Sequence, residues 1–326
     1  MKSMNSRYIS CLFALALLVC GCTNQQDDEE IRLFDGRIGV SASLPDPIVT
    51  TRTAAVANPY QGTTPSTSNV LDASVWFSTT SGTYEAGALA NTLPRHTEVK
   101  FNSSGTVYPE SEILLYPESG TVYCVGLYPY SETEWTTNAG NTEAYHDIDG
   151  SQDLMFAPQI SGTKASPISS SLAFTHQLTW LKINVIAEDN SAISSWGNVT
   201  NITVTSPGNK LTVNLSAGTA SCNSTSTNIT AFEGSSALKI TSQDFGSIFC
   251  APATGYNISV TTANGGTKNL GTVALKQLDG ETAVDDVAYA KGKMFVITLN
   301  FKPFKTIDAT CTLTTWDDVY QTIEGS

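Results

Sequence analysis

The chain has 326 residues, of which 40% are hydrophobic and 14% charged, and its formal net charge is −13. This hydrophobic content is sufficient for a buried core, which excludes a wholly disordered chain. The acidic balance, 17 Lys and Arg against 30 Asp and Glu, excludes nucleic acid as a main partner, because that binding depends on basic side chains that neutralise phosphates.

Residues 1–21 have the pattern of a bacterial lipoprotein signal peptide. Lys2 and Arg7 precede an apolar stretch at 11–19 that is too short to span a bilayer. The following Val-Cys-Gly-Cys ends at Cys22 and resembles a lipobox, so Cys22 is the predicted site of lipid attachment. An ordinary signal peptide that happens to contain a cysteine is the alternative. Acyl chains on Cys22 would anchor the mature chain in the outer membrane.

Residues 22–36 are predicted to form an acidic tether. Four consecutive carboxylates run from Asp27 to Glu30. They fit a solvated linker, and they equally resemble the surface-export signal of Bacteroidetes lipoproteins.

Alternating apolar and polar residues predict β-strands in the first half of the chain. The first predicted strand is 38–44, and Pro45 ends it. Two hairpins are expected, at 97–109 and 112–130, each with a glycine-containing turn. The segment 178–188 has the length of a short helix, but its β-branched alternation favours a strand.

The second half repeats this pattern at intervals of roughly ten residues, which is typical of β-sandwiches. Strands are predicted at 199–206, 211–215, 237–241, 256–262, 270–275, 293–301 and 309–316. We therefore expect an all-β protein with two sandwich domains, the N-terminal at 37–175 and the C-terminal at 176–326.

Motifs for catalysis are missing from the sequence. Three histidines occur, none in an HExxH pair, and there is no GxSxG or GxxxxGK[ST] motif. We therefore expect no enzyme activity and no cofactor. His176 lies in an apolar run and is expected to be a hydrogen-bonded structural imidazole.

The stretch 147–153 places aspartates at positions one, three and seven of a calcium-type loop. Its glycine comes too early, and Pro158 stands where a bidentate Glu is needed. We therefore expect an ordinary Asp/Gly turn and no metal site.

Four cysteines remain after the predicted signal peptide and lipidated Cys22, and they permit three disulfide connectivities. Their spacing is too wide for a zinc site, and buried thiols are the simplest expectation. They are Cys124, Cys222, Cys250 and Cys311.

Four sequence blocks resemble, in order, the fimbrillin-like proteins of the Bacteroidales. They are the Tyr-Pro, turn, strand, Tyr-Pro-Tyr block at 115–130, the SQDLMFA stretch at 151–157, the LAFTHQL block at 172–178, and the closing strands at 293–316. Together they cover most of residues 38–316.

The resemblance implies a structural or adhesive subunit of a type V pilus. It implies two transthyretin-like β-sandwiches on a surface lipoprotein of the outer membrane or fimbrium. In stalk subunits of the family, a trypsin-like protease cuts after an arginine and releases the first strand. The C-terminal strand of another pilus subunit then inserts by β-strand addition. A host or bacterial surface ligand is a further implied partner.

Carried onto this chain, the resemblance makes Ile38, Val40 and Leu44 the groove-filling side chains of the first strand. The cut would follow Arg52, whose alternative interpretation is an ordinary exposed loop arginine. Only ten residues follow Trp316, which leaves no obvious donor strand if both closing strands belong to the second domain. An anchor, tip or accessory subunit is therefore favoured over a stalk subunit.

The alternative function is a surface glycan-binding lipoprotein of a polysaccharide-uptake system. It would share the lipobox, the acidic tether and the sandwich folds. Its sugar-stacking candidates are Tyr123, Tyr128, Tyr130 and Trp135, although alternating aromatic residues in strands belong more often to a core.

Overall fold

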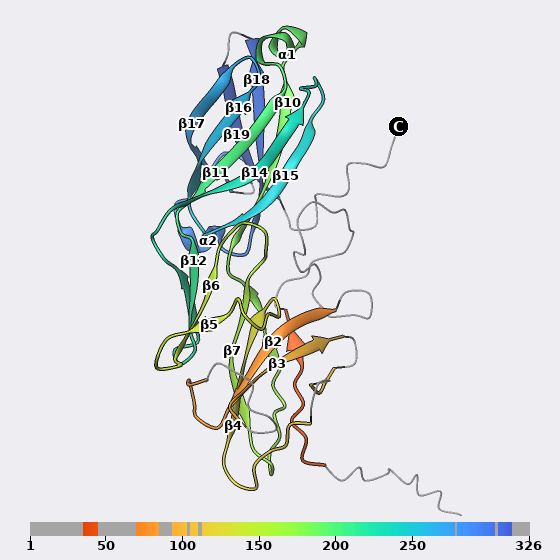
Figure 1. Cartoon of the computed structure of the whole chain (residues 1–326), viewed down its shortest axis with the longest axis vertical. Coiled ribbons are helices and arrows are strands. Elements are labelled where there is room, and N and C mark those ends of the chain that lie inside the picture. The colour runs from red at the N-terminus through yellow and green to blue at the C-terminus, as the bar shows by residue number, and fades with distance from the viewer. Residues whose placement is uncertain are drawn as a thin grey trace, which may run out of the picture. The chain divides into compact units, whose positions relative to one another are not determined.

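The computed structural model describes residues 35–44, 70–84, 93–102, 105–109, 113–277, 279–303 and 306–314. Strands dominate them and two short helices interrupt them (Figure 1), so the predicted all-β class is confirmed. Among the described residues, no helix has the length and apolar character needed to cross a bilayer.

A five-stranded sheet is built mainly from the first half of the chain, and a four-stranded sheet combines strands of both halves. The five-stranded sheet has the order β3-β2-β4-β7-β9 and consists of β2 (Leu71–Ser78), β3 (Arg95–Phe101), β4 (Val122–Tyr128), β7 (Met155–Gly162) and β9 (Thr175–His176). The four-stranded sheet has the order β13-β12-β6-β5 and consists of β5 (Thr136–Thr137), β6 (Glu143–Asp147), β12 (Lys210–Asn214) and β13 (Thr219–Cys222).

The second of these sheets takes strands from both sides of the predicted domain boundary at 175/176. Strand β6 lies before the boundary and pairs along its whole length with β12, which lies after it. We call this sheet the shared sheet. The boundary itself stays a prediction.

Two further four-stranded sheets follow in the second half of the chain (Figure 1). One has the order β15-β10-β18-β19 and consists of β10 (Thr179–Ala187), β15 (Gln243–Cys250), β18 (Met294–Lys302) and β19 (Thr306–Thr314). The other has the order β14-β11-β16-β17 and consists of β11 (Val199–Ser206), β14 (Thr227–Ser236), β16 (Gly255–Thr262) and β17 (Gly266–Ala274). The segment 178–188 is a strand, as its alternation predicted.

Helix α1 (Asn190–Trp196) was not predicted, although its start and end carry ordinary local signals. The side chain of Asp189 accepts a hydrogen bond from the Ala192 amide at 2.8 Å, which caps the first turn. Gly197 ends the helix with φ of 66°. The second helix, α2 (Val287–Ala290), is a single turn.

Buried side chains form two clusters that divide the five-stranded sheet by face. In β2, Val75 and Phe77 belong to the smaller cluster, whereas Trp76 between them belongs to the larger one. Leu211 and Val213 of the shared sheet also belong to the larger cluster. Both faces of the five-stranded sheet therefore carry core residues.

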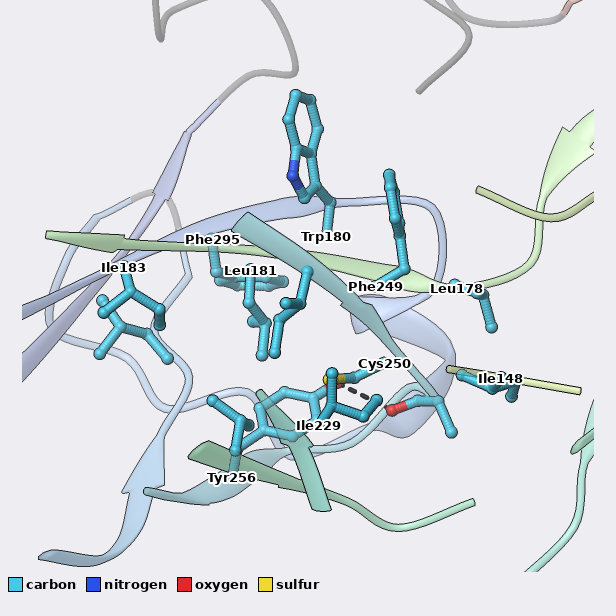
Figure 2. Packing of buried hydrophobic residues seen from close by; sticks show 14 of the residues in the cluster. Ile148, Leu178, Trp180, Leu181, Ile183, Ile229, Phe249, Cys250, Tyr256 and Phe295 are labelled. Carbon is cyan, nitrogen blue, oxygen red and sulfur yellow. Dashed lines mark hydrogen bonds between the residues drawn. The ribbon is translucent and has the colours of Figure 1, made fainter. Parts of the chain in front are cut away.

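The larger cluster continues through the sheets of the second half. Figure 2 shows Trp180 of β10 beside Phe249 of β15 and Tyr256 near Cys250. The ring centroids of Trp180 and Phe249 are 5.8 Å apart. The Tyr256 hydroxyl donates to the Ala251 carbonyl at 2.9 Å, which satisfies its polar group inside the core.

Both predicted hairpins are wrong. Strand β3 pairs with β2 instead of 106–109, and β4 lies between β2 and β7 instead of pairing with 112–117. Val107 pairs instead with Val40, and Leu115 with Arg37. Alternation fixes which side chains share a face, but the pairing partner is chosen by tertiary packing.

The strand predicted at 237–241 is also absent, and strands β13, β14 and β15 were not predicted. Strand β14 has a single buried residue, Ile229, and half of its residues are exposed, so its sequence shows little apolar alternation. Strand β15 contains Gly246, whose φ of 106° breaks the regular pattern.

Candidate functional site

The N-terminal segment, residues 37–44, is hydrogen-bonded along one edge to the chain near residues 107 and 114. The Ile38 amide donates to the Leu114 carbonyl at 2.8 Å. Val40 exchanges two backbone hydrogen bonds with Val107, at 2.9 and 2.8 Å. Only Ala42–Ser43 (β1) form a regular strand, so the ladder is shorter than the predicted 38–44.

The opposite edge of the N-terminal segment is paired with β8 (Leu172–Ala173), and this pairing is parallel. The amides of Leu172 and Phe174 donate to the carbonyls of Ser41 and Ser43, at 2.7 and 2.9 Å. Successive residues of an extended chain turn their carbonyls to opposite edges, which explains why residues 38 and 40 bond one way and 41 and 43 the other. The segment is thus held on both edges.

Apolar side chains of the N-terminal segment point into the smaller core cluster. Ile38 is 0% exposed and Val40 1% exposed, and both belong to this cluster. Leu44 is half-buried and packs against it. Burying each such aliphatic side chain contributes about 1.5–3 kcal/mol, so removing the segment would uncover a substantial apolar surface.

Residue 39 lies close to the exposed side chains of two residues. A Cβ atom at Gly39 would lie 2.6 Å from Cγ2 of Thr106 and 2.8 Å from Cε1 of Tyr108. Just before it, the Arg37 guanidinium lies 4.5 Å from the centroid of the Tyr108 ring. The backbone of the segment therefore lies directly against residues 106–108.

The two covalent sites proposed from the sequence, Cys22 and Arg52, lie outside the described residues. Lipid attachment at Cys22 and cleavage after Arg52 therefore remain predictions. The residues that hold the N-terminal segment were seen in the sequence only as hairpin strands and as part of the 172–178 block. These residues share apolar alternation, which indicates a strand but not the strand with which it pairs.

The C-terminal end of the described chain is an edge strand. Strand β19 pairs antiparallel with β18 over its whole length, and it is the terminal strand of its sheet. Ile307, Ala309 and Leu313 are half-buried against the larger cluster, whereas the residues between them are mostly exposed. Both closing strands therefore belong to the sheet in this structure.

The aspartates of the 147–153 stretch do not converge. Oδ1 of Asp149 accepts hydrogen bonds from the amide and hydroxyl of Ser151, at 2.8 and 2.7 Å, as in an ordinary Asx turn. Asp153 is fully buried, and its Oδ2 lies 2.7 Å from Nδ1 of His176. His176 is thus hydrogen-bonded within the structure.

All four cysteines are free thiols in the structure, although the sequence left disulfide pairing open. Burial raises the pKa of Cys222 and of Cys311 to about 11, and it raises the pKa of Cys124 and Cys250 further. Such thiols stay protonated at neutral pH and are poor nucleophiles.

The four aromatic residues considered for sugar stacking do not form an exposed row. Tyr128 and Trp135 are buried, and Tyr123 packs against the larger cluster. Tyr130 is half-buried and donates to Glu132 at 3.1 Å. Most of this aromatic surface is core, as strand alternation usually implies.

These observations define an all-β fold of packed sheets. Its N-terminal segment is hydrogen-bonded on both edges and buries apolar side chains in the core. The sequence matches the family described as fimbrillin-like over residues 56–316. The chain belongs to this family.

One solved structure supports the fold, and two others are reported for comparison. A candidate cell adhesion protein from Bacteroides uniformis is similar at a TM-score of 0.51 and 16% identity, covering 87% of this chain and 100% of that one. A second, from Bacteroides ovatus, has a TM-score of 0.47 and 16% identity, covering 86% and 97%. The fimbrial anchor protein Mfa2 from Porphyromonas gingivalis has a TM-score of 0.44 and 10% identity, covering 86% and 98%. No curated protein matches the sequence significantly.

Proposed function

We propose that this protein is a structural or adhesive subunit of a type V pilus, without enzymatic activity, on the bacterial outer surface. Membership of the fimbrillin-like family supports this proposal. Anchoring through a lipid on Cys22 and association with other pilus subunits are parts of the same proposal.

The N-terminal segment is the proposed blocking strand, and its burial is the observation that carries the mechanism. Ile38 and Val40 pack in the smaller cluster, and the backbone of residues 38–43 is hydrogen-bonded to one neighbour on each edge. Cleavage after Arg52 would allow the segment to leave. The emptied site would then offer unpaired backbone groups and apolar pockets to a donor strand of another subunit.

The position of β19 supports an anchor, tip or accessory subunit rather than a stalk subunit. Its half-buried side chains contact the larger cluster, so donating this strand would remove part of the protein's own packing. A subunit that keeps β19 in place could still receive a donor strand at its N-terminal site.

Limited trypsin digestion of the folded mature chain tests the mechanism. We expect cleavage after Arg52, identified by N-terminal sequencing, with loss of residues 22–52. The Arg52→Gln variant should lose this cleavage, and the matched control Arg95→Gln should retain it. SDS-resistant ladders after cleavage would assign a stalk role, and clean cleavage without ladders an anchor, tip or accessory role.

Resistance of Arg52 while other loops are cut would contradict strand release. So would cleavage after Arg52 with the N-terminal segment still bound after gel filtration under native conditions, because a blocking strand must leave its site.

A further inference from the structure

The outward face of the shared sheet is polar, and the proposed pilus mechanism does not involve it. In β6, Ala144 and His146 are buried, while Glu143, Tyr145 and Asp147 point to the other face. In β12 the same alternation turns three polar residues outward, Lys210, Thr212 and Asn214. In β13 the outward residues are Thr219 and Ser221.

Strand register places a tyrosine in the middle of this polar face. Tyr145 lies opposite Thr136 on one side and Thr212 on the other, and Thr212 lies opposite Ser221. The Tyr145 hydroxyl donates to Oε2 of Glu143, which fixes the ring and raises the pKa of this tyrosine. A half-buried aromatic ring is thus surrounded by hydroxyl groups on an otherwise polar sheet.

One end of this face borders an open hollow of about 700 Å³. It is lined by Asp147, Asp149, Lys210, Asn223, Thr227 and Asn228, among others. These groups are polar side chains of both donor and acceptor type.

Several of these groups are already held in place. The Asn223 side chain accepts from the amides of Asn209 and Lys210, at 2.9 and 3.1 Å, and donates to Oδ1 of Asn209 at 2.7 Å. Asn228 accepts from the Thr205 hydroxyl at 2.8 Å. Polar groups fixed before binding lose little conformational entropy when a ligand arrives.

The charge of this surface indicates which class of ligand it can bind. Glu143, Asp147 and Asp149 outnumber the one lysine, Lys210, and the whole chain carries a net charge of −13. Asp147 and Lys210 are open to solvent, with side chains 80% and 44% exposed and 3.4 Å between Oδ1 and Nζ. Acidic ligands are disfavoured on such a surface. Hydroxyl-rich neutral ligands match its mixture of donors, acceptors and one aromatic ring.

We propose that the outward face of the shared sheet, together with the hollow at its Asp147 end, binds a neutral oligosaccharide. The Tyr145 ring would stack against the C–H face of one sugar. The carboxylates, Lys210 and Asn228 would bond the hydroxyls of the next sugar in the hollow. This inference goes beyond the proposed pilus role and does not depend on strand release.

A glycan-binding assay on the mature chain tests it. The probes are immobilised oligosaccharides that end in neutral hexoses or N-acetylhexosamines, together with sialylated forms of the same glycans. We expect binding to at least one neutral probe, weakened by its sialylation. Tyr145→Ala should lower the affinity about tenfold, a loss of about 1.4 kcal/mol. Ile240→Ala, which removes an exposed apolar side chain outside the shared sheet and the lining of the hollow, should leave it unchanged.

Chemical-shift mapping with the bound neutral probe on the wild-type chain is the second measurement. It decides the question if Tyr145→Ala does not fold, and we expect the shifts to concentrate on β6 and β12. The proposal is overturned if no neutral probe binds, if sialylated probes are preferred, or if binding leaves β6 and β12 unshifted. None of these outcomes bears on cleavage after Arg52, so the two proposals fail separately.

Discussion

Gly39 allows the N-terminal segment to pack closely against residues 106–108. Gly39→Ala should lower the free energy of unfolding by about 1 kcal/mol, because the exposed side chains of Thr106 and Tyr108 must shift to make room for its Cβ. Urea unfolding followed by tryptophan fluorescence measures the change. The matched control is Gly140→Ala, whose Cβ would meet its nearest neighbour at 3.7 Å. Equal effects of the two substitutions would contradict close packing at residue 39.

His96 is a residue that the sequence did not single out, and it should make the fold sensitive to acid. Its ring stacks on Trp76 with centroids 3.6 Å apart, and its buried Nε2 has no hydrogen-bond partner among the described residues. Burial, and secondarily the charge of Arg95, lowers the pKa of His96 from 6.5 to about 3. The folded state therefore disfavours the protonated imidazole.

The pH dependence follows from this difference. Between pH 6.5 and about 3 the unfolded chain binds a proton that the folded chain does not, so stability falls as the pH is lowered. His96 should contribute a slope of at most about 1.4 kcal/mol per pH unit. His96→Phe keeps an aromatic ring on Trp76 without a titrating group. Its stability should fall less steeply in urea titrations from pH 7 to 4, and parallel curves would show that His96 is not responsible.

At the scale of elements, the N-terminal segment should behave as a separable strand. A chain that begins at Thr53 lacks Ile38 and Val40, so it should expose the smaller cluster and bind the dye ANS. A synthetic peptide of residues 35–46 should rebind and suppress this fluorescence, because it restores both apolar side chains and the backbone hydrogen bonds.

The matched control is the same peptide with Val40→Asp, which would bury an unpaired carboxylate. It should bind at least about a hundredfold more weakly, a loss of about 2.8 kcal/mol. If both peptides bind alike, the site does not recognise side chains, and the blocking-strand proposal loses its basis.

At the scale of the whole molecule, the shared sheet should couple the two halves of the chain. Leu211 and Val213 of β12 pack in the larger cluster, and β12 pairs with β6 from the first half. Residues 176–326 expressed alone would leave that edge of β12 unpaired and Leu211 less covered. We expect this fragment to lack the dispersed amide NMR spectrum that residues 37–326 give. A well-dispersed spectrum of the fragment would show that the predicted boundary at 175/176 separates independent domains.

Apolar alternation and turn residues by themselves determined the all-β class, because a period of two and Gly or Asn turns are local properties of the chain. Ordered sequence blocks led to the fimbrillin-like family. Strand pairing was decided only by the tertiary structure: the runs at 106–109 and 112–117 were expected to form hairpins, yet Val107 and Leu115 pair with Val40 and Arg37. Backbone hydrogen bonding is the same for every residue type, so a strand's sequence shows which face is apolar but not which strand lies beside it. The same reason explains the polar face around Tyr145, since β6 and β12 are far apart in sequence and only folding brings them together.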